Sequence, residues 1–199
     1  MNLPNKITLT RICMIPVFVI VFYLGYLSQW CFLASAVVFL GAALTDALDG
    51  HIARSRGLVT NLGKFLDPIA DKVLVSTAFI LLLTLPTAFC ITPLGVHGTI
   101  VAGVCVALIL ARELIVSGFR MIAAGRNLVL AADKLGKIKT CFQDGAIAFL
   151  LVSMSFFGST AGDVLAYIGI VLFLICTVLT VLSGVNYLVK NKQVLKEQE

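Results

Sequence analysis

Four aspartates lie within one 26-residue stretch of a chain that is otherwise mostly apolar. They are Asp46, Asp49, Asp67 and Asp71, and the whole chain has only ten acidic residues. Carboxylates near a bilayer are costly and usually serve a function. Oxygen ligands gathered at one level suit a hard divalent cation such as Mg2+ or Mn2+. The pattern therefore predicts metal-assisted chemistry on a phosphate at a membrane surface.

The aspartates follow helical spacing on two segments, each of which would place them on one helix face. Asp46 is followed after three, four and seven residues by Asp49, Gly50 and Ala53. The second stripe has one member in every four residues: Gly63, Asp67 and Asp71. Two antiparallel helices could bring both stripes face to face around one or two cations, and we expect two. The glycines would let a ligand approach the backbone, and Arg54 could bind phosphate through two hydrogen bonds.

The same aspartates could instead form a solvated ion network with the basic residues around them. These are Arg54, Arg56, Lys64 and Lys72. One aspartate at a helix end would favour that interpretation. Four of them on two faces, together with two glycines, favour a metal site.

The composition is that of an integral membrane protein. The hydrophobic fraction is 60%, charged residues make up 13%, and the mean hydropathy is +1.06. A soluble domain carries roughly twice that charge. The six cysteines occur singly in apolar segments, as small hydrophobic residues, and indicate neither disulfides nor zinc. We expect a membrane lipid environment and no nucleic-acid partner.

Stretches of about 20 apolar residues predict membrane-spanning helices. Six windows qualify: 12–28, 31–50, 72–94, 98–120, 141–158 and 164–189. The expected links include 51–64 and 125–139. The predicted fold is therefore all-α, a polytopic bundle of six transmembrane helices. We expect one membrane domain over residues 1–199, with a short amphipathic N-terminal segment (1–11) and a polar tail (190–199).

The basic residues orient this bundle. All 15 lie before the first span, in the two long links or near their ends, or after the last span. By the positive-inside rule, both termini and both long links face the cytoplasm. The aspartates would then lie at the cytoplasmic face of a multi-pass protein of the inner (cytoplasmic) membrane.

The aspartate stretch resembles the signature of the CDP-alcohol phosphotransferase family. Its eight specified positions match without a gap: Asp46-x2-Asp49-Gly50-x2-Ala53-Arg54-x8-Gly63-x3-Asp67-x3-Asp71. The resemblance implies six transmembrane helices, a homodimer and transfer of a substituted phosphoryl group from a CDP-linked donor to an alcohol. It implies that the four aspartates bind the metal and that Asp71 also serves as general base. Residues near the CDP donor would be Asn5, Thr8, Gly50, Ala53, Arg54 and Gly63.

A cationic cluster begins in the last part of the fourth window, continues beyond it, and suits an acceptor that carries its own phosphate. Its members are Arg112, Arg120, Lys137 and Lys139. The run GKIKTCFQ (136–143) resembles a stretch typical of the phosphatidylglycerophosphate synthases within the family, as does the opening Pro4-Asn5-x2-Thr8-x2-Arg11. The resemblance implies CDP-diacylglycerol and sn-glycerol 3-phosphate as substrates, and CMP as a product.

Several alternatives stay open at the level of sequence. The acceptor could be inositol phosphate or, as in cardiolipin-type enzymes, a glycerol phospholipid, whereas the basic residues disfavour serine. The lysines could also be anchors to anionic lipids. Arg112 could form a buried ion pair with Glu113 or Asp144. A divalent-cation transporter is disfavoured because the aspartates lie at helix ends and no repeat is found. An inactive scaffold is a further alternative, although every specified position of the signature is intact.

Overall fold

The computed structural model describes residues 3–56, 61–89, 96–125 and 134–191. Side chains are described for residues 9–45, 72–85, 87–89, 97–123 and 135–191. Within these ranges the chain is helical apart from short turns, which confirms the all-α prediction. The helices are α1 (Leu3–Leu24), α2 (Trp30–Arg56), α3 (Asn61–Leu83), α4 (Pro86–Phe89), α5 (Val96–Gly125), α6 (Lys134–Ser155) and α7 (Thr160–Lys190).

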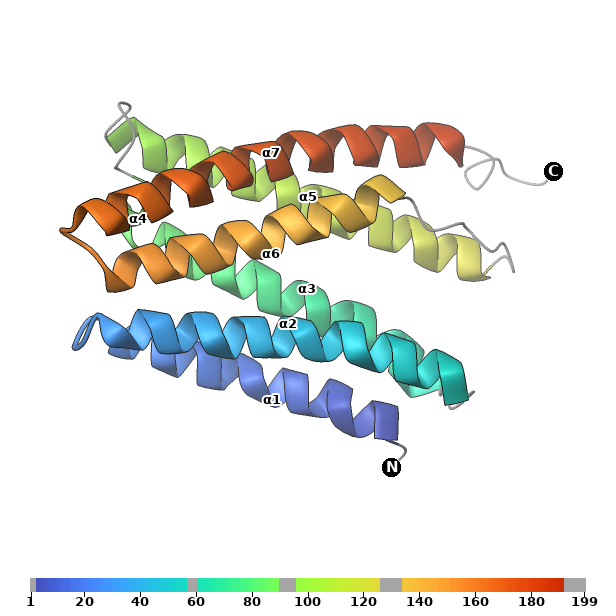
Figure 1. The fold of residues 1–199 in the computed structure, drawn as a ribbon. Helices are drawn as coiled ribbons and strands as arrows, with labels where there is room; N and C mark the ends of the chain where they lie inside the picture. Colours follow the sequence, from blue (N-terminus) through green and yellow to red (C-terminus); the bar gives the residue numbers. More distant parts are fainter. Residues whose placement is uncertain (1–2, 57–60, 90–95, 126–133, 192–199) are drawn as a thin grey trace.

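The long helices run side by side as one elongated bundle (Figure 1). The start of α1 and the end of α7 lie at the same end of the bundle. The end of α2, the start of α3, the end of α5 and the start of α6 lie at that end as well. The bundle therefore collects the basic and acidic segments of the sequence at one end, as the charge distribution predicted.

Among the described side chains, the outer surface of the bundle is largely apolar. His97–Ala123 and Thr160–Lys190 are long and apolar enough to cross a membrane, and Leu9–Leu24, Trp30–Thr45 and Lys72–Leu83 are shorter apolar helices. Large apolar side chains on these helices are exposed, for example Leu114 at 70% and Val37 at 64%. Exposed apolar surface of this extent is typical of contact with lipid or with another protein. The helices thus fit a membrane protein, and the number of spans stays a prediction.

Several helix bounds differ from those expected. The window 72–94 predicted one helix, but α3 ends at Leu83 and the short α4 begins at Pro86. Proline lacks the backbone N–H that a continuing helix requires, so a break before Pro86 is the expected result. The link expected over 51–64 is also too long, because α2 continues to Arg56 and α3 begins at Asn61. Apolar windows mark the lipid-facing part of a helix and miss the turns that extend beyond it.

Helices α6 and α7 form the most extensive helix pair in the described chain. The turn between them uses Gly158 at a φ of +84°, and Ser159 then caps α7 by accepting a hydrogen bond from the Gly162 backbone N–H at 3.1 Å. The buried face of α7 consists largely of small residues, which let two helices approach closely. Members of this face are Gly162, Ala166, Gly169, Cys176, Thr177, Thr180, Ser183 and Gly184.

Gly169→Ala should destabilise the bundle, because a Cβ at this position would lie 2.9 Å from Leu150 Cγ and 3.1 Å from the Leu150 backbone nitrogen. Overpacking of this kind costs on the order of 1–3 kcal/mol. The measurement is the thermal midpoint of the purified protein in detergent. Gly103→Ala is the matched control, since no heavy atom lies within 4 Å of a Cβ there. Equal midpoints for the two variants would contradict the close packing of α6 and α7.

Candidate functional site

The aspartates of the motif lie on the helix ends that meet at the basic end of the bundle. Asp46 and Asp49 belong to the last turns of α2, and Asp67 and Asp71 belong to the first turns of α3. Only residues 57–60 separate these two helices. The two acidic helix ends therefore lie at the same end of the bundle (Figure 1), and the face-to-face arrangement of their aspartates stays a prediction.

The side chains of the predicted metal and donor residues lie outside the described residues. This applies to Asn5, Thr8, Asp46, Asp49, Gly50, Ala53, Arg54, Gly63, Asp67 and Asp71. Their backbone positions fall in α1, α2 and α3. Among the side chains that are described, no group of three His, Cys, Asp or Glu residues is placed to hold a metal ion.

A polar cavity of about 40 Å³ lies between α3, α5 and α6. Its wall is formed by Lys72, Val75, Ser76, Leu110, Glu113, Lys139, Thr140 and Gln143. Asp71 immediately precedes Lys72 and stands one helical turn before Val75. The cavity therefore begins next to the last aspartate of the motif. A space of this size holds about three water molecules.

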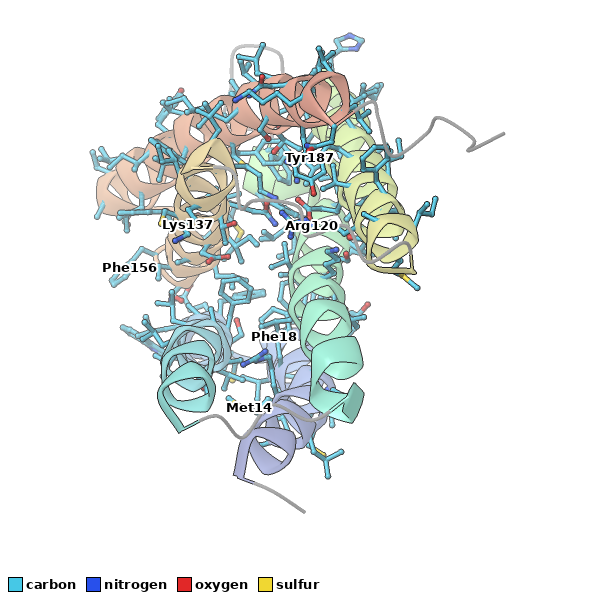
Figure 2. The ribbon with its side chains drawn as sticks, turned by 90° about the vertical axis from the view of Figure 1, so that its right-hand side faces the viewer. Met14, Phe18, Arg120, Lys137, Phe156 and Tyr187 are labelled. Carbon is cyan, nitrogen blue, oxygen red and sulfur yellow. The ribbon has the colours of Figure 1, made fainter. Side chains whose placement is uncertain are left out.

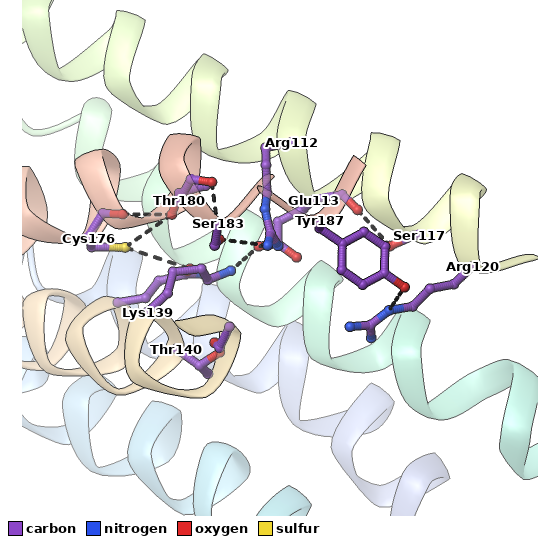
Figure 3. A network of polar contacts seen from close by, with 12 residues as sticks. Arg112, Glu113, Ser117, Arg120, Lys139, Thr140, Cys176, Thr180, Ser183 and Tyr187 are labelled. Carbon is purple, nitrogen blue, oxygen red and sulfur yellow. Dashed lines mark hydrogen bonds and ion pairs between the residues drawn. The ribbon is translucent and has the colours of Figure 1, made fainter. Parts of the chain in front are cut away.

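Two residues of the cavity wall belong to a buried ion cluster in which two cations share one carboxylate. Glu113 Oε1 accepts a hydrogen bond from Lys139 Nζ and forms an ion pair with Arg112 Nη1 at 3.4 Å (Figure 3). The side chains of Lys139, Arg112 and Glu113 are 5%, 14% and 17% exposed. Because these charged groups are largely removed from water, they are stabilised mainly by one another. The cluster therefore fixes Lys139 at the cavity and carries an excess of positive charge.

Arg112 lies behind Glu113 and outside the cavity wall. Its Nη2 donates a hydrogen bond to Ser183 Oγ of α7 at 2.8 Å. The ion pair with Glu113 confirms one of the two pairings considered for Arg112. Its role in binding an acceptor phosphate stays a prediction.

Arg120 lies two turns further along α5 and is held by an aromatic side chain of α7. Arg120 Nε donates a hydrogen bond to the Tyr187 hydroxyl at 3.3 Å, and the guanidinium carbon lies 5.4 Å from the centroid of the Tyr187 ring. The two residues lie together in the view along the helices (Figure 2). Phe119 packs edge-on against the same ring. Arg120 is exposed, and the buried Tyr187 therefore sets the orientation of its side chain.

The two lysines of the GKIKTCFQ run lie on different faces of α6. Lys139 is buried, whereas Lys137 is exposed. Residues two apart on an α-helix are separated by about 200° around the axis. The structure thus brings Lys139 to the cavity together with Glu113 and Lys72, and Lys137 does not line it.

Sequence reasoning did not assign Lys72, Ser183 or Tyr187 to the site. The available signal was the spacing of polar residues on α7, an otherwise apolar helix. Thr177, Thr180, Ser183 and Tyr187 recur every three or four residues and share one face. Their partners on α5 could not be identified from that spacing alone.

The fold and the site define an all-helical protein of the membrane type, with two acidic helix ends beside a cationic cavity. The family model for CDP-alcohol phosphatidyltransferase matches residues 1–190, and the chain belongs to this family.

Three relatives are similar to the chain over almost its full length, and each is named CDP-diacylglycerol–glycerol-3-phosphate 3-phosphatidyltransferase. The protein of Bacillus subtilis (strain 168) is 39% identical, over 98% of this chain and 97% of its own length. That of Salmonella typhi is 37% identical, over 94% and 93%. That of Escherichia coli (strain K12) is 36% identical, over 99% and 98%.

Glu113→Gln should lower the stability of the protein, because it leaves Lys139 and Arg112 buried without their shared carboxylate. Removing one partner of a buried ion pair costs on the order of 3 kcal/mol. Thermal midpoints of Glu113→Gln, Lys139→Ala and the double variant form a cycle that isolates the pair. The double variant should lose less stability than the two single losses added together. Strictly additive losses would mean that Glu113 and Lys139 do not interact.

Proposed function

We propose that this protein transfers the phosphatidyl group of CDP-diacylglycerol to sn-glycerol 3-phosphate, giving phosphatidylglycerophosphate and CMP. The observation that carries the proposal is the cationic cavity that begins one residue after the aspartate motif. The motif accounts for the CDP-linked donor, and the cavity offers a place for an acceptor that brings its own negative charge. The names of the three relatives describe the same reaction for those proteins.

A divalent cation fits the residues of the motif. All four candidate ligands are carboxylates on two neighbouring helix ends, which is a donor set for Mg2+ or Mn2+ and not for a soft metal. We propose that Asp46, Asp49, Asp67 and Asp71 hold two such ions. When bound, the ions would neutralise charge on the pyrophosphate and on the departing CMP. Asn5, Thr8, Gly50, Ala53, Arg54 and Gly63 are proposed to surround the CDP part of the donor.

Asp71 is the proposed general base. An alcohol is a poor nucleophile at neutral pH and needs a base within hydrogen-bond reach. In the proposed step, the primary hydroxyl oxygen of the acceptor bonds to the phosphorus that carries the lipid. The bond from that phosphorus to the bridging pyrophosphate oxygen breaks, CMP leaves with the electron pair, and Asp71 takes the hydroxyl proton. The position of Asp71, directly before the cavity residue Lys72, supports this assignment.

The acceptor phosphate is proposed to bind in the cavity. Of the four cations predicted for it, Lys139 is the one on the cavity wall, and Arg112 supports it through Glu113. Arg120, held by Tyr187, would add positive charge nearer the end of the bundle. Lys137 was predicted to bind the same phosphate, but its exposed face favours contact with lipid head groups.

The proposed setting is a homodimer in the inner (cytoplasmic) membrane. Each chain would form one membrane domain with six spans. The common end of α1 and α7, which carries the acidic and basic groups, would face the cytoplasm (Figure 1). This orientation places the reaction at the leaflet where the water-soluble acceptor is available.

Purified protein supplied with Mg2+ or Mn2+ should release CMP from CDP-diacylglycerol when glycerol 3-phosphate is added. Inositol phosphate, serine and phosphatidylglycerol serve as alternative acceptors, and release with one of these instead would reject the proposed acceptor.

Asp71→Asn should lower kcat about 100-fold or more, the usual effect of losing a general base. Asp163→Asn, an exposed acid in the first turn of α7, is the matched control and should keep activity. Full turnover by Asp71→Asn would refute the base assignment.

Lys139→Ala should raise the KM for glycerol 3-phosphate about tenfold or more while changing the KM for CDP-diacylglycerol little. The size follows from the loss of a hydrogen bond to a charged group. Lys137→Ala removes the same charge from the opposite face of α6 and should leave both KM values close to those of the unmodified protein. Steady-state kinetics in mixed micelles provide both constants. A larger acceptor effect for Lys137→Ala than for Lys139→Ala would place the phosphate elsewhere.

A further inference from the structure

Arg112 crosses from α5 to α7 through a gap that only glycine leaves open. A Cβ on residue 184 would lie 2.8 Å from Arg112 Cγ and 3.3 Å from Arg112 Nε. The Cγ atom is near the base of the side chain, so a small rotation of the guanidinium end would not relieve this contact. Gly184 therefore determines whether Arg112 can take its observed path.

Ser183 fixes the far end of the same side chain. Its hydroxyl donates a hydrogen bond back to the Thr180 carbonyl oxygen at 3.3 Å, within α7. The hydroxyl oxygen then accepts the bond from Arg112 Nη2 at 2.8 Å. Because the proton of Ser183 is directed toward Thr180, its lone pairs are available to Arg112. Ser183 and Gly184, which we name the arginine seat, are both buried.

The arginine seat reaches the cavity only through other residues. Neither Ser183, Gly184 nor Arg112 is part of the cavity wall, whereas Glu113 and Lys139 are. Arg112 holds Glu113, and Glu113 in turn binds Lys139 (Figure 3). Within the described side chains, the buried Nε of Arg112 has no hydrogen-bond partner, so Arg112 depends on Ser183 and Glu113 for its polar contacts.

We infer that Ser183 and Gly184 are positioning residues for the acceptor: they seat Arg112, which orients Glu113 and thereby places Lys139 for the acceptor phosphate. This inference rests on the proposed function. It assigns to α7, which contributes no residue to the cavity wall, control over the affinity for one substrate. The residues proposed for the donor belong to α1, α2 and α3, whereas the arginine seat belongs to α7.

The test measures KM for both substrates and kcat in Ser183→Ala, Gly184→Ala and the control Gly103→Ala. Ser183→Ala should raise the KM for glycerol 3-phosphate about tenfold, as expected when a hydrogen bond to a charged group is lost. The donor KM should stay within about twofold, the scatter usual for independent sites. Gly184→Ala should act in the same direction, and Gly103→Ala should change neither KM. Equal increases in both KM values would indicate a general structural defect and overturn the inference.

A double-variant cycle separates positioning from direct or purely structural effects. In a Lys139→Ala background, Ser183→Ala should raise the acceptor KM little further, because the residue that it positions is already absent. If the two substitutions together raise the acceptor KM by the product of their separate factors, the inference is overturned. This cycle does not require the Gly184→Ala variant, so it remains decisive even if that variant proves too unstable to purify. Turnover of the unmodified protein with glycerol 3-phosphate tests the proposed function separately. If another anionic acceptor is used, the same cycle on that acceptor's KM still tests the arginine seat.

Discussion

The sharing of one carboxylate between two buried cations is the interaction on which the site depends. Glu113 holds Lys139 of α6 and Arg112 of α5, and Arg112 is bonded to Ser183 of α7. Three helices are thereby tied together at the level of the cavity. Buried ion pairs contribute little net stability compared with apolar packing. The role that we infer for this cluster is therefore to hold charged side chains in fixed positions at the cavity. Its positive excess would be balanced when a phosphate enters.

This cluster requires helices that approach closely without losing their apolar outer surfaces. Helix α7 meets both demands, because its buried face carries small and hydroxyl-bearing residues while its outer face carries exposed valine, leucine and isoleucine. Its hydroxyls bond to their own helix, as in the bond from Thr180 Oγ1 to the Cys176 carbonyl at 2.7 Å. These hydroxyl groups therefore need no hydrogen-bond acceptor on another helix. A helix facing lipid can thus also determine the geometry of a polar site.

Much of the architecture was predictable from the sequence, because apolar windows and helix-spaced aspartates depend on local pattern alone. Each of the six windows overlaps one of the six long helices among the described residues, and the charge distribution identified the common end of the bundle. The break before Pro86 and the helical continuation to Arg56 were missed, since hydropathy does not mark helix ends. The contacts of Arg112 with Ser183, and of Arg120 with Tyr187, join residues about 70 positions apart, which no local pattern reveals. The different faces of Lys137 and Lys139 could have been read from helical geometry, but their burial required the fold.

The most direct test of the account is the 31P relaxation rate of glycerol 3-phosphate in the presence of protein and Mn2+. A paramagnetic ion on the aspartates would broaden the acceptor signal only if the phosphate binds close by, in the cavity of Lys139. We expect strong broadening with the unmodified protein and with Lys137→Ala, and its loss in Lys139→Ala at the same Mn2+ concentration. Unchanged broadening in Lys139→Ala would contradict the proposal that this cavity holds the acceptor beside the metal site.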